Sequence, residues 1–309
     1  MTDTNILTST SSLSGTMQIF YSRDFLERVK LMTVYSVGAQ KKSMPQKGGK
    51  TVYFNRFSRL AAATTPLTEG TNPSATSLSS TVVSATVAQY GDFAQVSDMY
   101  DLTSIDTGLQ ESVSVFAQQG AETIDALVLA ELVSGSTEQL AGGAADITAI
   151  AASDVLSGAE IRKAVKTLKQ NGAMKFEDGF FKGIVPVSSE YDLRGNSEWL
   201  DAFKYTNAAN IINGEIGTLH GVKFYDTNLE HSESSTVTVY STFIFGKNAY
   251  GIVDIAGGSN VEIIVKKSGA NDTSNPLNMF STIGWKVKAF AAKVLNAAWV
   301  IEIKAGSQA

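Results

Sequence analysis

The chain has 309 residues, of which 43% are apolar and 18% charged, and its formal net charge at pH 7 is −5. It is long enough to bury a substantial core, and its low content of charged residues is typical of a protein that hides surface in contacts with other subunits. The negative charge argues against a protein that coats nucleic acid, and the absence of cysteine excludes disulfides, thiol nucleophiles and Cys-based zinc sites.

The N-terminal third predicts an arm, a short helix and a long hairpin. Residues 1–18 are rich in Ser and Thr, lack a targeting signal and predict an extended arm. Apolar residues at helical spacing predict a short helix over about 22–32. Residues 51–57 and 81–90 alternate and are rich in β-branched or aromatic residues, and a segment rich in Pro, Gly and Thr separates them. They predict a two-stranded hairpin, which has too little apolar face to be stable without a partner.

From about residue 104 the apolar residues recur with the period of a helix. They predict a helix over about 104–133, with these residues on its buried face: Leu109, Val113, Phe116, Ile124, Leu127, Val128 and Leu132. A second amphipathic helix is expected over about 153–170, where an Asn-Gly pair ends it. Residues 176–235 predict a mixed α/β unit, and residues 236–303 predict mainly strands.

Acidic and basic residues are segregated along the chain. No Asp or Glu occurs between Arg28 and Thr68, and no Lys or Arg occurs between Leu60 and Ile161. Such runs are usually two solvated faces of opposite sign. The alternative is that a basic loop of one subunit docks on an acidic helix of its neighbour, and this contact would set register and choice of partner. On this alternative the candidate subunit-interface residues are Arg28, Lys30, Lys41, Lys42, Lys47, Lys50, Arg56, Arg59, Asp106, Glu111, Glu122 and Asp125.

The sequence carries no motif that we interpret as a catalytic, cofactor-binding or metal-binding site. Residues 48–51 imitate the end of a phosphate-binding loop, but Met44 stands where the first glycine belongs, and a strand is expected to follow instead of a helix. His220 and His231 are interpreted as surface or turn residues, because no nucleophile elbow accompanies them. Three acidic residues are interpreted as helix caps rather than ligands of a divalent cation: Asp98, Asp101 and Asp106. We therefore predict that the protein is not an enzyme.

Several segments, together with the order of the elements, carry a resemblance to a known family: NGEIG (213–217), FGKNAYGIVD (245–254), VEIIVKK (261–267), NPLN (275–278), IGWK (283–286) and AAKVLN (291–296). The chain resembles the major capsid proteins of tailed double-stranded-DNA bacteriophages, in particular a podophage-type subfamily with the Hong Kong 97-type capsid fold. The resemblance implies an α+β fold made of the following parts: an N-terminal arm (1–49), an extended loop (50–100), a peripheral domain with a long spine helix (101–150 and 236–309) and an axial domain (151–235).

The resemblance also implies a function in assembly. It predicts a coat protein that self-assembles as hexamers and pentamers into an icosahedral head shell enclosing double-stranded DNA, without sequence-specific DNA binding and without a membrane. Portal, scaffold and cement proteins are the further partners it implies, and the virion, assembled in the host cytoplasm, is the location. In this fold the extended loop lies over the peripheral domain of the neighbouring subunit, which agrees with a basic loop that docks on an acidic helix. The alternative is the shell protein of a bacterial cargo-enclosing compartment with the same fold.

Overall fold

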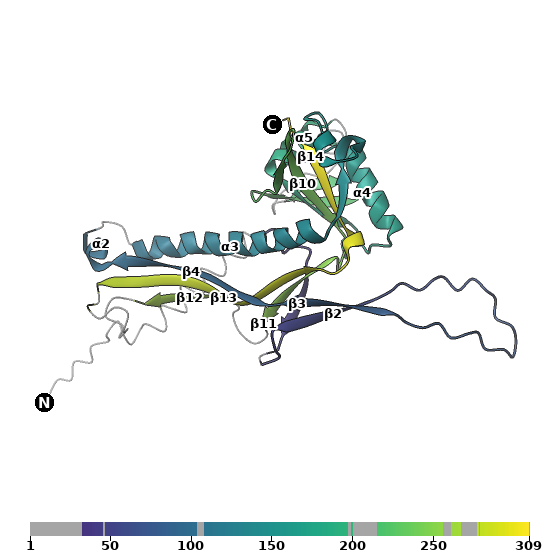
Figure 1. Cartoon of the computed structure of the whole chain (residues 1–309), viewed down its shortest axis with the longest axis horizontal. Helices are drawn as coiled ribbons and strands as arrows, with labels where there is room; N and C mark the ends of the chain where they lie inside the picture. The colour runs from purple at the N-terminus through teal and green to yellow at the C-terminus, as the bar shows by residue number, and fades with distance from the viewer. Residues whose placement is uncertain are drawn as a thin grey trace.

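The fold combines a long helix, two large sheets and a projecting hairpin (Figure 1). The computed structural model describes residues 33–45, 47–103, 108–196, 199, 215–255, 261–266, 277 and 279–308. The predicted arm over 1–18 and the predicted helix over 22–32 lie outside these residues. Within the described part of the chain, no helix is long and apolar enough to span a membrane.

The helix predicted over 104–133 is confirmed as α3 (Gly108–Gly135), which follows the short helix α2 (Asp98–Thr103). It lies along a five-stranded sheet, as Figure 1 shows. That sheet consists of β1 (Gln40–Met44), β4 (Ala88–Ser97), β11 (Tyr250–Ile255), β12 (Val261–Lys266) and the central β13 (Phe280–Val294). Three of the predicted core residues, Phe116, Val128 and Leu132, are buried in the cluster between α3 and the strands. The apolar stripe of α3 therefore positions this helix on the sheet.

A second, seven-stranded sheet forms a compact part at one end of α3 (Figure 1). Its strands are β5 (Thr137–Leu140), β6 (Phe181–Pro186), β7 (Glu215–Leu219), β8 (Val222–Thr227), β9 (Ser232–Ser234), β10 (Thr238–Phe245) and β14 (Val300–Gly306). Helix α4 (Gly158–Gln170) begins at an N-cap, Ser157, and is followed by Asn171 and the positive φ of Gly172. A shorter helix, α5 (Val187–Gly195), contacts strands of the same sheet.

This sheet contains strands from two of the parts that the resemblance implied. Strands β5, β10 and β14 come from the expected peripheral domain, where β14 pairs with both β5 and β10, and β10 also pairs with β6 of the expected axial domain. The expected boundary between residues 235 and 236 therefore lies between strands of one sheet. The physical reason is that strand pairing joins segments far apart in the chain, so the order of elements alone does not reveal it.

Strands β2 (Thr51–Phe57) and β3 (Ser80–Thr86) form the predicted hairpin, paired antiparallel from Thr51–Thr86 to Phe57–Ser80. The second predicted strand, 81–90, is two strands: from Ala88 onward the chain pairs as β4 with β13. The base of the hairpin is held by a small apolar cluster that includes Phe54 and Val253. Gly251 permits this contact, because a Cβ there would lie 2.8 Å from the Phe54 ring.

Candidate subunit interfaces

The hairpin of β2 and β3 presents the largest continuous exposed segment of the described chain. Every residue from 57 to 82 is exposed. Alternation along β2 buries Phe54 and leaves Tyr53 and Phe57 57% and 67% exposed. Further large apolar side chains are exposed along the same segment: Leu60, Leu67, Leu78 and Val82. An extended segment that leaves several large apolar side chains in water is typical of a contact with another protein.

The basic residues predicted for the interface gather at the base of this hairpin, but they are not equivalent. Lys41, Lys47 and Lys50 are exposed, and none of them pairs with a carboxylate among the residues that the structure describes. The ammonium of Lys42 donates to the carbonyl of Tyr53 and lies 5.3 Å from the ring centre of Phe54. Lys42 therefore helps to join β1 to the hairpin within the subunit.

Two predicted arginines also contact their own subunit. The guanidinium of Arg56 donates to the carbonyl of Leu295 at 3.4 Å. Arg59 is exposed and lies beside Gly172, where an added Cβ would be 3.1 Å from its Nη1 atom. These contacts orient the base of the hairpin relative to β13 and α4. The other two predicted basic residues, Arg28 and Lys30, lie outside the described residues.

The predicted acidic residues of the long helix also include both an exposed residue and one that contacts its own subunit. Glu122 is exposed on α3 and accepts a 2.8 Å hydrogen bond from Gln118. Asp125 is only 4% exposed, and its carboxylate accepts a 2.7 Å hydrogen bond from the backbone N–H of Val34. The structure describes the backbone of Glu111 in α3 but not its side chain. Asp106 lies outside the described residues.

Asp125, which was predicted to be a docking residue, is buried in its own subunit. Its carboxylate acts within its own subunit, since it lies on the same helical face as Ala121, Val128 and Leu132, all of which are buried. Burial raises the pKa of this carboxyl to about 6, although the backbone hydrogen bond from Val34 opposes the shift. The helical spacing of these four residues is visible in the sequence and places Asp125 on the buried face of the helix. The interpretation based on charge alone did not use this spacing.

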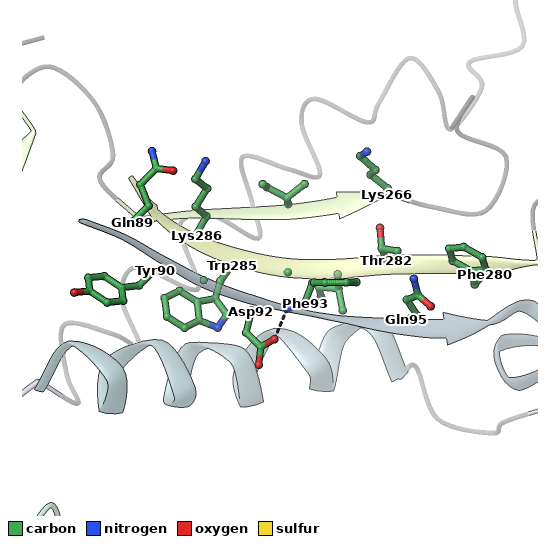
Figure 2. A pocket seen from close by; sticks show the side chains of 14 residues that line it. Gln89, Tyr90, Asp92, Phe93, Gln95, Lys266, Phe280, Thr282, Trp285 and Lys286 are labelled. Atoms are coloured by element: carbon green, nitrogen blue, oxygen red, sulfur yellow. Dashed lines mark hydrogen bonds between the residues drawn. The ribbon is translucent and has the colours of Figure 1, made fainter. Parts of the chain in front are cut away.

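A second exposed surface, not predicted from the sequence, is the face of the β4–β13–β12 sheet that points away from α3. Figure 2 shows Asp92 and Trp285 turned toward the helix, whereas Gln89 and Lys286 point to the opposite side. Phe93 is 65% exposed and pairs across the strands with Gly284, beside a hollow of about 650 Å³. A Cβ on residue 284 would lie 2.8 Å from the Cβ of Phe93, so the glycine makes room for this aromatic side chain.

This face continues into the tip formed by α2 and the start of β13. A neighbouring hollow of about 680 Å³ is lined by apolar side chains from two segments, including Met99 of α2 and Leu277 and Met279 just before β13. All three side chains are more than half exposed. The end of the subunit farthest from the hairpin therefore also carries apolar surface available for association.

The two histidines lie in ordinary structural surroundings. His220 occupies the turn between β7 and β8 with φ = 51°, as interpreted from the sequence. His231 lies 3.4 Å from Glu233, close to the buried Glu302. The ammonium of Lys304 is 2.7 Å from Glu233, so a positive charge already neutralises this group of oxygens. This arrangement does not favour a bound metal cation.

Comparison with known proteins agrees with the resemblance seen in the sequence. A model of the family described as phage capsid protein matches residues 39–304. The capsid of Ralstonia phage GP4 aligns with a TM-score of 0.70 at 13% identity, covering 89% of this chain and 89% of that chain. The Cyanophage Pam1 capsid aligns with a TM-score of 0.64 at 12% identity, covering 90% of this chain and 93% of that chain. The head of Helicobacter pylori bacteriophage KHP40 aligns with a TM-score of 0.64 at 12% identity, covering 87% and 88%, respectively. No curated protein sequence matches significantly.

Because their sequence identities to this chain are low, the solved structures show the fold alone. That fold is the α+β, Hong Kong 97-type fold of phage capsid proteins. The family match extends over most of the chain and concerns a structural protein. The chain therefore belongs to the phage capsid protein family and is a major capsid protein that forms the head shell of a virion.

Proposed function

We propose that the subunits assemble as hexamers and pentamers by placing the β2–β3 hairpin of each subunit over the α3 side of its neighbour. The observation that carries this proposal is the hairpin itself, because its residues 57–82 are exposed and include Phe57, Leu67 and Leu78, each more than 60% exposed. Covering these side chains removes apolar surface from water, which is the main favourable contribution to association. A shell closes when such a contact is repeated around symmetry axes.

Charge complementarity then fixes the register of the hairpin on its neighbour. Lys41, Lys47 and Lys50 supply the exposed positive charges at its base, and Glu122 is the exposed carboxylate on α3. Such pairs act mainly on specificity and on the rate of association. The remaining predicted participants are Arg28, Lys30, Arg59, Asp106 and Glu111. Asp125, Lys42 and Arg56 contribute instead to the structure of each subunit, because each contacts its own chain.

The proposed domain roles follow the sheets. We assign the peripheral role to α3 with the five-stranded sheet and the axial role to the seven-stranded sheet with α4 and α5. On this assignment β5, β10 and β14 belong to the axial unit. The protein acts by assembly and not by catalysis, it assembles in the host cytoplasm, and portal, scaffold and cement proteins are its further partners.

The docking is tested with the double variant Lys47→Glu/Lys50→Glu and the charge-preserving control Lys47→Arg/Lys50→Arg. Shells are separated by sedimentation and identified by electron microscopy at low and high salt. We expect the Glu variant to keep its unfolding midpoint but to lose at least about tenfold in shell yield, since two attractive contacts per subunit become repulsive. Adding Glu122→Lys restores part of the yield. An unchanged yield in the Glu variant would rule out the electrostatic docking.

The second candidate, a bacterial cargo-enclosing compartment, shares the fold but differs in contents. The family match favours the phage reading. Particles purified from cells in which the whole virus replicates are expected to contain double-stranded DNA protected from nuclease. Particles that hold an enzyme and no DNA would support the compartment instead.

A further inference from the structure

Helix α4 carries a row of positive charges on the side away from the core. Ile161, Val165 and Leu168 are buried against the seven-stranded sheet. The exposed basic residues of the helix are Arg162, Lys163, Lys166 and Lys169. Three of them, at positions 162, 166 and 169, are spaced i, i+4 and i+7 and therefore lie on one stripe. This helix lies on the outside of the compact part of the subunit (Figure 1).

The turn between β7 and β8 adds a fourth nitrogen-bearing group to this stripe. His220 is placed there by its left-handed backbone, and its Nε2 lies 3.5 Å from Nη1 of Arg162. A hollow of about 430 Å³ is lined by this histidine and the basic stripe, together with Val165 and Gln170. Among the described residues that line it, none is acidic. Glu160, which lies 3.7 Å from Lys163, is not part of the lining.

The composition of this surface favours a nucleic acid over a protein as its binding partner. Interfaces between proteins are depleted in lysine at their centre and enriched in aromatic residues, Met and Arg. None of the exposed large apolar side chains in the described chain lies on α4. Interfaces with nucleic acid are instead polar and strongly positive. A surface made of Arg162, Lys166 and Lys169 has the second composition.

The geometry of the stripe fits a phosphate backbone. Positions 162 and 169 are seven residues apart, which corresponds to about 10 Å along the helix. Successive phosphates of one DNA strand are about 3.4 Å apart along the duplex axis, so three flexible cationic side chains span several phosphates. Gln170 is the only amide in the lining, and lysines positioned along a backbone read no base sequence.

We propose that the basic face of α4, formed by Arg162, Lys166, Lys169 and His220, contacts the phosphate backbone of the double-stranded DNA that the shell encloses. The proposal rests on the assignment as a capsid protein, and it identifies the axial surface that faces the genome. Three phosphate contacts per subunit are few and depend on salt, so the DNA is held loosely and moves past them during packing. The net charge of −5 keeps the rest of the subunit from adhering to DNA.

The test measures binding of the purified full-length subunit, before shell formation, to a fluorescent 20-base-pair duplex between 50 and 200 mM salt. The variant Arg162→Gln/Lys166→Gln/Lys169→Gln removes the stripe. The control Lys247→Gln/Lys266→Gln/Lys288→Gln removes the same charge from other surfaces. For the native chain, we expect the logarithm of the association constant to fall linearly with the logarithm of the salt concentration. The slope should be about −2.7, because three phosphate contacts contribute about −0.9 each. Affinity should fall at least about tenfold in the stripe variant and change less than about twofold in the control.

Two results would overturn the proposal: native subunits that do not bind the duplex at 50 mM salt, or an equal loss in the stripe variant and the control. A stripe variant that binds DNA normally but forms no shells would show that α4 contacts an acidic surface of another subunit instead. Shell yield is measured separately by sedimentation, so a failure of hairpin docking is distinguished from a failure of DNA contact.

Discussion

The backbone N–H of Val34 donates a 2.7 Å hydrogen bond to Oδ2 of Asp125, which lies in the middle of α3. The two residues are 91 positions apart in the chain. The next residue, Tyr35, is buried, and its carbonyl accepts a 2.6 Å hydrogen bond from the hydroxyl of Tyr250. The segment that leads into β1 is therefore fastened both to the long helix and to β11.

We predict that Asp125 makes subunit stability depend on pH. Its folded-state pKa of about 6 exceeds the ordinary value of 3.8, so between these values the folded chain binds more protons than the unfolded chain. The free energy of unfolding therefore falls as pH rises through this window, by up to about 3 kcal/mol. In Asp125→Asn this contribution is absent. Urea unfolding of unassembled subunits at pH 4.5 and 7.5 measures it, with Glu122→Gln as a control that should follow the native chain. Identical pH dependence in Asp125→Asn and the native chain would contradict the prediction.

Gln119 is predicted to connect α3 to two strands. Its amide oxygen accepts a 2.8 Å hydrogen bond from the indole N–H of Trp285, and its amide nitrogen donates to Asp92 at 2.7 Å. Gln119→Leu should lower the free energy of unfolding by about 1–3 kcal/mol, because the buried indole N–H loses its acceptor. It should also shift the tryptophan emission and raise the pKa of Asp92, which this bond holds below its usual range. Gln118→Leu, at an exposed neighbouring position, should change stability by less than about 0.5 kcal/mol. Equal effects of the two substitutions would argue against the connection.

Gly284 is predicted to be required for the pairing of β13 with β4. In Gly284→Ala the new Cβ would lie 2.8 Å from the Cβ of Phe93 and 2.9 Å from the carbonyl oxygen of Asp92. Since the carbonyl belongs to the backbone, the strands must move, at a cost of about 1–3 kcal/mol. Gly195→Ala is the matched control, because its added Cβ would meet no atom within 4 Å beyond its chain neighbours and the backbone of its own helix. Thermal unfolding of both variants checks the difference, and a Gly284→Ala chain as stable as the control would refute it.

Lys304 is predicted to stabilise the seven-stranded sheet through its buried ammonium. Its side chain is 7% exposed and lies 2.9 Å from Glu138 and 2.7 Å from Glu233. Lys304→Met should lower the free energy of unfolding by about 2–3 kcal/mol, somewhat less than for a fully buried pair, because both partner carboxylates are accessible to water. The exposed pair Lys247–Glu177 provides the control, since Lys247→Met should cost less than about 1 kcal/mol. Denaturant unfolding measures both, and equal losses would contradict the prediction.

The elements that could be predicted from the sequence are those defined by local patterns. The spacing of Phe116, Val128 and Leu132 predicted α3, and the alternation of residues 51–57 predicted β2. The end of the second helix was marked by Asn171 and Gly172, whose backbone preferences act within one turn. In each of these cases a short stretch of chain contains the whole physical cause.

Predictions that depended on distant partners were incomplete. The strand over 81–90 divides because its second half pairs with β13, nearly two hundred positions later. The pairing of β10 with both β6 and β14, across the expected boundary at 235/236, could not be inferred from the order of the elements. The hollow beside Phe93 was missed, since it depends on Gly284 lying directly across from it in a neighbouring strand.

The sequence by itself determined the class of this protein: the absence of cysteine excluded thiol chemistry, the apolar periods defined the long helix and the hairpin, and the C-terminal segments carried the family resemblance. Tertiary structure alone decided which charges are available to other molecules. Asp125 is buried inside the subunit and Lys42, although exposed, bonds to its own hairpin, whereas Lys47 and the stripe on α4 face outward. The sequence shows which residues carry charge. Whether a charged side chain can contact another molecule depends on its burial and on intramolecular partners that only folding brings together.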